Sequence, residues 1–447
     1  MSTPLVAPAG ALPADLLVRQ ARVLDPRAGR DGEADVLVQG GEIAEIGASG
    51  ALSPSPGTEL IEGEGRTLLP AFFDCHVHLR TPGQEHKEDL DTGTRAAAAG
   101  GFCGVVAMPN TAPPVDSPEL LRSLRETAAA QARVPVGFLA AITRELAGQE
   151  LTDMAELSDL GALGFTDDGL PVVSAGVLRR AMQYQRLAGG VLALHEEDPA
   201  LSAGGALHEG PVSALLGVRG VPSLAESTMV ARDAALAAYE GARVHIQHVS
   251  CAQSLDAVAA AKADGGALTA EVTPHHLLLC EEDVRDLDPR VKTNPPLRGA
   301  EDRRALVEAL RDGTLDCIAT DHAPHAREDK EVPFEQAAMG TTGLETAFAA
   351  LHTELVLGGA LELGTLVERL TAGAAVMGLA MPRLAPGEPA NLTLVDLEAE
   401  WQVGEEGYES RSENCCFAGR RVTGRVLLTV AGGAVAYRQR QFALSAA

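Results

Sequence analysis

The pattern of apolar and polar positions changes twice along the chain and divides it into three parts. Near the start, apolar residues roughly alternate with polar ones in runs separated by Gly-rich turns, over 16–25, 34–47 and 58–65. The same texture returns over 391–397 and 424–439, after a Pro/Gly-rich stretch. Alternation with a period of two predicts strands with one buried face. We expect the two ends of the chain to pair into one small β-sandwich.

In the middle part, short apolar runs alternate with stretches of helical periodicity, which is typical of a parallel sheet built from βαβ units. We expect eight strands, over 68–76, 104–108, 134–142, 162–166, 191–195, 243–248, 267–272 and 316–321. Helices are expected between them, for example over 117–132 and 254–265, each beginning at a Ser and the second ending at a Gly. Eight such units close most simply into a (β/α)8 TIM barrel.

The predicted fold class is therefore α/β, with one large barrel and one small β domain. The predicted limits are 1–65 for the first part of the β-sandwich, 66–384 for the barrel and 385–447 for the second part of the sandwich. Hydrophobic residues make up 46% of the chain but aromatic residues only 3%, so the core must consist mainly of Ala, Val and Leu. Such residues suit helices packed on a parallel sheet.

The formal net charge of -26 changes the range of partners that we expect. Nucleic acids and anionic membranes require clustered Lys and Arg, so we expect neither as a partner. A small anionic substrate would need local positive charge, which metal ions or a few arginines could supply. The acidity otherwise indicates a well-hydrated surface.

The seven cysteines are scattered without a C-x-x-C pair, which is typical of free thiols in a reducing compartment. The first residues lack the basic and apolar segments of a signal peptide. The sequence also has no run of about 18 apolar residues, which a membrane-spanning helix requires. We expect a cytoplasmic protein.

Several predicted strands end in residues that bind metals, and the carboxyl ends of barrel strands form the active-site face. His76 and His78 follow the first strand, and residues two apart on a strand point the same way, so both imidazoles can reach one ion. Later strands end at Asp167 and Asp168, His195, His248 and Asp321. Each residue alone is more simply a solvated or core side chain, but together they favour a metal site.

The residue types also indicate which metal is bound. Histidine nitrogens and carboxylates without thiolates suit Zn²⁺, with Co²⁺ or Mn²⁺ as substitutes. Six candidate ligands are too many for one tetrahedral ion, so we expect two ions that share a bridge. Residue chemistry alone leaves open whether Asp167 or Asp168 is that bridge.

Several longer motifs support the same assignment. They are HVHLR (76–80), PGQEHKEDL (82–90), MPNTAPPVD (108–116), FTDDG (165–169), HVS (248–250), NPPLR (294–298), ATDHAPH (319–325) and GLET (343–346). Over about residues 15–440 the chain resembles the dihydroorotases of the amidohydrolase superfamily, and ATDHAPH with MPNT is specific to that family. The resemblance implies a reversible cyclisation of N-carbamoyl-L-aspartate to L-dihydroorotate in pyrimidine synthesis.

The resemblance also implies a set of metal ligands. One zinc ion is held by His76, His78 and Asp321, and a second by His195 and His248, with Asp168 and a hydroxide as the bridges. Asp167 is the fallback for the bridge, and the number of ions present in the cell, one or two, stays open. Many relatives use a carboxylated lysine as this bridge, but the chain has no lysine between Lys87 and Lys262.

Catalytic and substrate-binding roles follow from the same resemblance. Asp321 would act as both metal ligand and general base or acid. Arg80 can form a bidentate pair with the substrate carboxylate, although a surface salt bridge is the simpler alternative. The remaining substrate contacts are implied at His78, Asn110, Asn294, His325, Met339 and Gly340, the last two through their backbone.

Other features receive a structural interpretation. His275 and His276 follow the seventh strand, but no metal position is left for them, and Cys75, Cys251 and Cys317 are expected to be small buried thiols. The segment 327–339 could form a mobile cover.

Two rival functions are weighed against this interpretation. One is another cyclic amidase, such as an allantoinase or dihydropyrimidinase, which the missing lysine and Arg80 disfavour. The other is a non-catalytic subunit, which the complete ligand set disfavours. We expect a homodimer, and a complex with aspartate carbamoyltransferase stays open.

Overall fold

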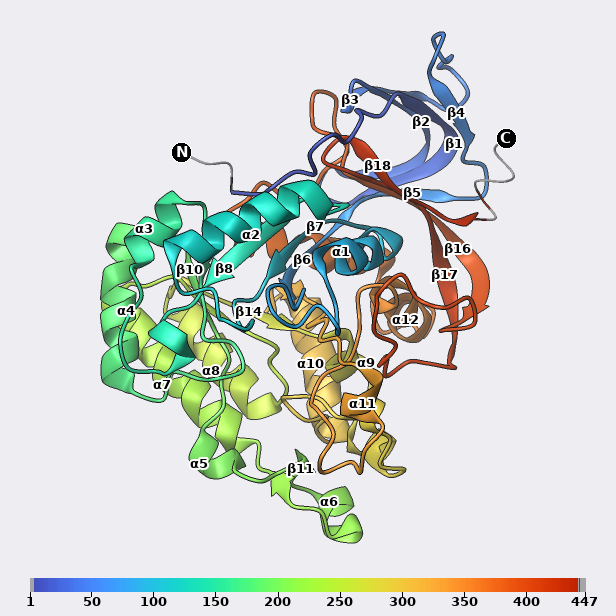
Figure 1. Cartoon of the computed structure of the whole chain (residues 1–447). Coiled ribbons are helices and arrows are strands. Elements are labelled where there is room, and N and C mark those ends of the chain that lie inside the picture. Colours follow the sequence, from blue (N-terminus) through green and yellow to red (C-terminus); the bar gives the residue numbers. More distant parts are fainter. Residues whose placement is uncertain (1–3, 441, 443–447) are drawn as a thin grey trace.

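The computed structural model describes residues 4–440 and 442, and these form a barrel with a smaller sheet beside it (Figure 1). The eight barrel strands are β6 (Phe72–Val77), β7 (Phe102–Ala107), β8 (Val136–Ala140), β9 (Gly164–Phe165), β10 (Val191–Leu194), β13 (Val244–Ile246), β14 (Leu268–Val272) and β15 (Cys317–Ile318). They are parallel and lie in chain order. The amide of His78 donates to the carbonyl of His322 at 2.9 Å, which joins the first strand to the last. The predicted eight-stranded TIM barrel is confirmed.

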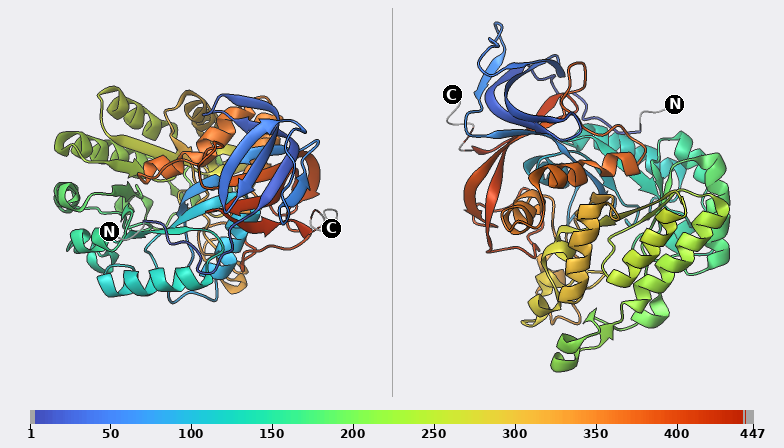
Figure 2. Two further views of the ribbon diagram at one scale, coloured as in Figure 1. Left: turned by 90° about the horizontal axis from the view of Figure 1, so that it is seen from above. Right: turned by 180° about the vertical axis from the view of Figure 1, so that it is seen from behind.

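Helices surround the barrel on its outer side (Figures 1 and 2). The longer ones are α1 (Leu90–Ala99), α2 (Pro118–Gln131), α3 (Met154–Asp159), α4 (Ala175–Ala188), α7 (Leu224–Glu240), α8 (Ala252–Ala263), α10 (Ala300–Asp312) and α13 (Leu363–Thr371). The helix predicted over 117–132 is α2, which begins after Ser117 as expected. The start predicted for α8 is wrong, because its N-terminal cap is Cys251. Ser254 lies buried inside the helix and donates to Glu226 at 2.6 Å.

Shorter elements occupy the connections. They include α5 (Pro199–Ser202), α9 (Pro274–Leu278), α11 (Arg327–Lys330), α12 (Ala347–Leu351) and α14 (Gly373–Val376). An arm made of β11 (Leu207–His208), α6 (Pro211–Leu216) and β12 (Gly220–Val221) projects from the barrel (Figure 1). No helix among the described residues is long and apolar enough to cross a membrane.

Both ends of the chain contribute to one eight-stranded sheet (Figure 1). Its strands are β1 (Leu16–Asp25), β2 (Arg30–Gln39), β3 (Glu42–Ala48), β4 (Glu59–Glu62), β5 (Thr67–Pro70), β16 (Leu392–Gln402), β17 (Arg421–Ala431) and β18 (Ala434–Arg438). The inner faces of the two halves share one apolar core, to which Val36 from the first half and Leu394 from the second contribute. The expected small β domain built from both termini is confirmed, and its strands are hydrogen-bonded in one continuous sheet.

The single strand predicted over 68–76 is wrong, because it is two strands that belong to different sheets. β5 pairs with β1 and β16 in the terminal sheet, whereas β6 is the first barrel strand. Both are fully buried, so the apolar run gives no sign of the break. The domain limits 1–65, 66–384 and 385–447 stay predictions. β5 lies after the first limit but pairs with strands of the terminal sheet.

Candidate metal centre

The six predicted metal ligands meet in one buried place. Each is in a barrel strand or follows one, and the set is His76, His78, Asp168, His195, His248 and Asp321. None has more than 7% of its surface exposed. Burying polar side chains costs free energy unless partners compensate them. The convergence of six such side chains therefore indicates a site.

His76, His78 and Asp321 form one group. Nε2 of His78 lies 3.0 Å from an oxygen of Asp321, and Nε2 of His76 lies 3.5 Å from the same oxygen. All three ligand atoms lie within 4.8 Å of one another. Two imidazoles and a carboxylate at these separations can surround one cation.

Asp168 lies between this group and the other two histidines. One of its oxygens is 3.6 Å from Nε2 of His76, 3.7 Å from Nδ1 of His195 and 3.8 Å from Nε2 of His248. Its second oxygen is 3.4 Å from Nε2 of His78. His195 and His248 themselves approach to 2.9 Å. A carboxylate placed in this way is within reach of two cations.

Asp167, the alternative bridge, is bonded to another strand end of the barrel. Its carboxylate accepts hydrogen bonds from the amides of Ile142 at 2.8 Å and Thr143 at 3.0 Å, and from the Thr143 hydroxyl. These bonds hold the side chain against the end of β8. The geometry therefore favours Asp168 as the shared ligand.

The charges at the site are strongly coupled. Burial opposes ionisation of Asp168, but His76 and His248 outweigh it and hold the pKa of Asp168 well below its usual range. Burial likewise opposes the charge on Asp321, and His76 and His78 outweigh it to lower its pKa to about 2. Burial opposes the positive charge on His76, but Glu271 and Asp168 outweigh it and raise the pKa of His76 well above its usual range. Metal binding at His76 would therefore displace a proton.

The donor set fits a bound cation. Nε2 of His76 is fully buried and has no hydrogen-bond partner among the described residues, although it faces two carboxylates. Such an orphaned nitrogen costs free energy unless something occupies the position in front of it. The six ligands offer nitrogen and oxygen but no sulfur, and this composition suits Zn²⁺.

Asn110 and Asn294, predicted to contact substrate, also hold metal ligands in place. The Asn110 carbonyl oxygen lies 2.9 Å from Nδ1 of His78, and its amide donates to Asp168 at 3.1 Å. The Asn294 amide donates to Glu197 at 2.7 Å, and Glu197 lies 3.2 Å from Nε2 of His195. The sequence prediction gave no role to Glu197, and its spacing of two from His195 was the available signal.

The predicted substrate residues Arg80 and His325 lie together beside this centre. A guanidinium nitrogen of Arg80 is 3.5 Å from Nε2 of His325, and its Nε donates to the carbonyl of Pro324 at 3.2 Å. Burial lowers the pKa of Arg80 to about 10, so it remains a cation at neutral pH. Burial, with Arg80 next, lowers the pKa of His325 to about 3, so this ring is neutral. The arrangement supplies the local positive charge that the acidic chain requires.

Met339 and Gly340 lie against His325. Nε2 of His325 is 2.8 Å from the Met339 carbonyl oxygen. Gly340 has φ of +135°, and a Cβ there would lie 2.7 Å from Cβ of Ala323 and 3.1 Å from Nε2 of His325. Its amide donates to the carbonyl of Lys292 at 2.8 Å. Only glycine fits this conformation and this close approach.

Two buried lysines hold the segment 327–339. Nζ of Lys292 donates to the carbonyls of Glu335 at 3.0 Å and Ala337 at 2.7 Å. Nζ of Lys330 donates to the carbonyls of Pro289 at 2.8 Å and Ala338 at 2.7 Å. A mobile cover stays a prediction, and these bonds would have to break for the segment to move.

The remaining candidates also have positions in the structure. His276 lies 2.8 Å from the Thr273 hydroxyl and 3.0 Å from the Pro295 carbonyl, as expected of a structural residue. All seven cysteines are free and buried, which confirms the expected free thiols. Sequence reasoning missed Glu271, which lies 2.6 Å from Nδ1 of His76. A single Glu in a strand of alternating residues gave no signal.

Comparisons with known proteins agree with this geometry. A family described as Dihydro-orotase-like matches residues 65–254. A dihydroorotase from Pelotomaculum thermopropionicum is 44% identical over 426 residues, which cover 95% of this chain and 99% of the relative. A dihydroorotase from Anaeromyxobacter dehalogenans is 45% identical over 430 residues, with 95% and 98% covered.

Solved structures support the fold. An L-hydantoinase from Arthrobacter aurescens superposes with a TM-score of 0.84 at 26% identity, over 94% of this chain and 96% of the other. A dihydropyrimidinase from Brevibacillus agri, at 24% identity and a TM-score of 0.80 over 95% of both chains, shares the fold. Since its curated relatives match at these identities over nearly their whole length, the chain belongs to the dihydroorotase family of cyclic amidohydrolases.

Proposed function

We propose that this dihydroorotase acts through two zinc ions, the first held by His76, His78 and Asp321, the second by His195 and His248, with Asp168 shared between them. The position of Asp168 carries the proposal, because its two oxygens lie within 3.4 to 3.8 Å of all four histidines. A shared aspartate takes the place that a carboxylated lysine has in many relatives. Occupancy by a single zinc ion is the alternative, and a zinc titration of activity distinguishes one ion from two.

The reaction interconverts N-carbamoyl-L-aspartate and L-dihydroorotate in pyrimidine biosynthesis. Bound zinc ions would lower the pKa of a shared water molecule and polarise the amide carbonyl. The protein supplies the rest of the chemistry, which consists of binding the substrate carboxylate, orienting the ring and moving one proton.

Asp321 is the proposed general base and acid. Its pKa of about 2 keeps it ionised at neutral pH, so it can accept a proton. In ring opening, Asp321 takes the proton from the attacking water and delivers it to the departing ring nitrogen. In ring closure the same carboxylate accepts the proton from the ureido nitrogen. Its φ of +47° is a left-handed conformation that only the surrounding structure maintains.

The substrate carboxylate is the part that distinguishes this substrate from neutral cyclic amides. Arg80 is a buried cation that can form two parallel hydrogen bonds with it. His78, Asn110, Asn294 and His325, with the backbone of Met339 and Gly340, complete the proposed substrate contacts.

A comparison of substrates tests this function. Purified chain loaded with zinc is assayed with dihydroorotate, allantoin and hydantoin at equal concentrations. We expect efficient ring opening of dihydroorotate alone, because only that substrate presents a carboxylate to Arg80. Turnover of hydantoin without turnover of dihydroorotate would contradict the proposal.

We also propose a cytoplasmic homodimer, with association to aspartate carbamoyltransferase as the alternative assembly. The support is the resemblance to dihydroorotases. Light scattering on the purified chain, alone and mixed with the transcarbamoylase of the same organism, tests the two assemblies.

A further inference from the structure

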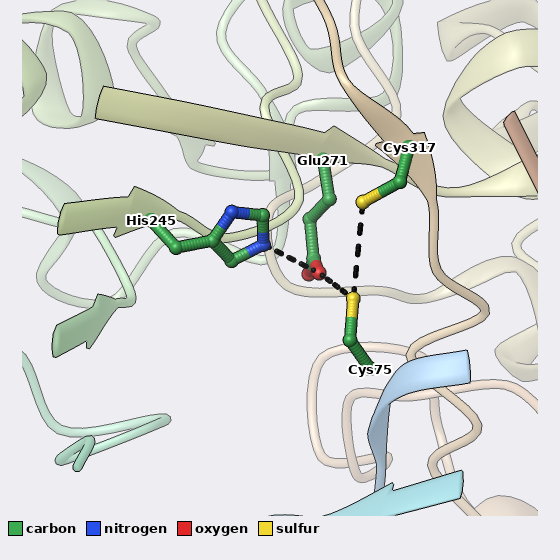
Figure 3. A group of neighbouring side chains, drawn as sticks. All are labelled: Cys75, His245, Glu271 and Cys317. Carbon is green, nitrogen blue, oxygen red and sulfur yellow. Dashed lines mark hydrogen bonds and ion pairs between the residues drawn. The ribbon is translucent and has the colours of Figure 1, made fainter. Parts of the chain in front are cut away.

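Glu271 of β14 lies under the metal centre and is fully buried. Its first oxygen lies 2.6 Å from Nδ1 of His76 and accepts from the amide of His248 at 3.2 Å. Its second oxygen lies 3.0 Å from Nε2 of His245 and accepts from the thiol of Cys75 at 3.3 Å. A carboxylate has about four lone-pair sites, so these four donors occupy it completely. Figure 3 shows two of them, His245 and Cys75.

We propose that Glu271 is a positioning residue that fixes one ligand at each of the two metal positions. The inference rests on the proposed metal centre. At the first position, Glu271 accepts from Nδ1 of His76, so the proton stays on Nδ1. Nε2 of His76, which is buried and has no hydrogen-bond partner in the described part of the chain, is then free to bind a cation. A carboxylate behind a metal-bound histidine also fixes the direction of the ring.

At the second position, Glu271 acts through the backbone. His248 has φ of +33°, a left-handed conformation that is unfavourable for a residue other than glycine. The hydrogen bond from the His248 amide to Glu271 helps to hold this conformation. One side chain thus joins β6, which carries His76, to the end of β13, which carries His248.

His245 and Cys75 complete the support for this carboxylate. Nδ1 of His245 lies 2.9 Å from the Thr269 hydroxyl, which leaves Nε2 to donate to Glu271. Sγ of Cys317 contacts Sγ of Cys75 at 3.8 Å (Figure 3). Cys75, His245, Glu271 and Cys317 lie close enough to hold a further ion. Because His245 and Cys75 already donate to Glu271, we assign these two residues to its support and make a third ion an outcome of the test.

The test compares Glu271→Gln with Cys317→Ser. Glutamine has the same shape but offers one acceptor oxygen, so two of the four donors lose their acceptor. Cys317 is equally buried and touches Cys75 but makes no hydrogen bond to Glu271 among the described residues. Competition with a chromophoric chelator measures zinc affinity for each equivalent, and the visible spectrum of the cobalt-loaded chains reports ligand geometry.

We expect Glu271→Gln to lose about 10- to 100-fold in zinc affinity at both equivalents and to show an altered cobalt spectrum. Cys317→Ser should keep both properties of the wild type. Unchanged affinity and spectrum in Glu271→Gln would overturn the inference, as would the loss of one equivalent alone or a third wild-type equivalent that Cys317→Ser lacks. A wild-type chain that binds no zinc would instead overturn the proposed centre itself.

A second variant covers the case in which Glu271→Gln does not fold. Thr269→Val removes the hydroxyl that orients His245 and keeps the shape of the side chain. We expect weaker zinc binding than in the wild type, by less than the loss expected of Glu271→Gln. Wild-type zinc affinity in a folded Thr269→Val chain would then overturn the inference.

Discussion

The neighbouring carboxylates of Asp167 and Asp168 serve different parts of the structure. Asp167 accepts hydrogen bonds from the amides of Ile142 and Thr143 at the end of β8. Asp168 faces the histidines, with one oxygen 3.4 Å from Nε2 of His78. Two adjacent residues of one motif therefore separate into a structural carboxylate and the carboxylate that we propose as the shared metal ligand.

This separation predicts opposite outcomes for two matched substitutions. Asp168→Asn should lower kcat more than about 100-fold, since losses behind a ligand alone cost 10- to 100-fold, and should lower zinc content. Asp167→Asn should keep its zinc, because the oxygen of an amide can still accept the hydrogen bonds from the amides of Ile142 and Thr143. Zinc analysis and steady-state kinetics check both variants. Zinc loss in Asp167→Asn alone would reverse the assignment.

Arg80→Lys is expected to weaken binding of the substrate carboxylate. Lysine is a point charge that cannot form the two parallel hydrogen bonds of a guanidinium. We predict a KM for dihydroorotate raised roughly 10-fold or more, which corresponds to about 1.4 kcal/mol, with normal zinc content. Dihydrouracil, which lacks the carboxylate, is the control substrate. An equal loss on both substrates would show that Arg80 does not recognise the carboxylate.

Gly340→Ala should distort the surroundings of His325. The added Cβ would lie 2.7 Å from Cβ of Ala323 in a backbone conformation with φ of +135°. We expect lower stability and a raised KM, because His325 and Met339 must shift. Gly359→Ala is the matched control, since Gly359 has φ of +75° but no atom within 4 Å of the added Cβ. Its unfolding free energy should fall by about 1 kcal/mol with KM unchanged. Equal kinetics in the two variants would contradict the prediction.

Lys330 predicts a pH dependence of stability. Burial, with Lys292 next, lowers its pKa from 10.5 to about 7. Between these two values the unfolded chain holds a proton that the folded chain has released, so the contribution of Lys330 to stability rises with pH. The unfolding free energy of the wild type, relative to Lys330→Met, should therefore increase from pH 7 to pH 9.5. Denaturant unfolding at both values measures it, and a constant or shrinking difference would show that Lys330 is not so perturbed.

Much of the barrel could be predicted from the sequence because its strands are short buried apolar runs with polar ligands at their ends. The run over 68–76 was misassigned because β5 and β6 are both buried. What separates the two strands is that β5 pairs with β1 and, far along the chain, with β16. The pairing with β16 joins residues more than 300 positions apart. The local pattern of apolar and polar residues gives no information about such a distant pairing.

The metal ligands of the candidate site could also be predicted from the sequence. His76, His78 and Asp321 stand in recognisable motifs at strand ends, so their types and positions indicated a metal. Glu271 could not be found in this way, because its role depends on reaching His76 across 195 positions of sequence. Residues that support a ligand from behind look like ordinary strand residues until the barrel closes.

The most direct test of the account is a zinc titration of activity on dihydroorotate, with the wild type and Asp168→Ala both stripped of metal beforehand. We expect the stripped wild type to be inactive and to regain full ring-opening activity as two equivalents of zinc are added. Asp168→Ala should stay at least about 100-fold less active at the same zinc concentration. Full activity of the stripped wild type, or of Asp168→Ala, would contradict a centre shared through Asp168.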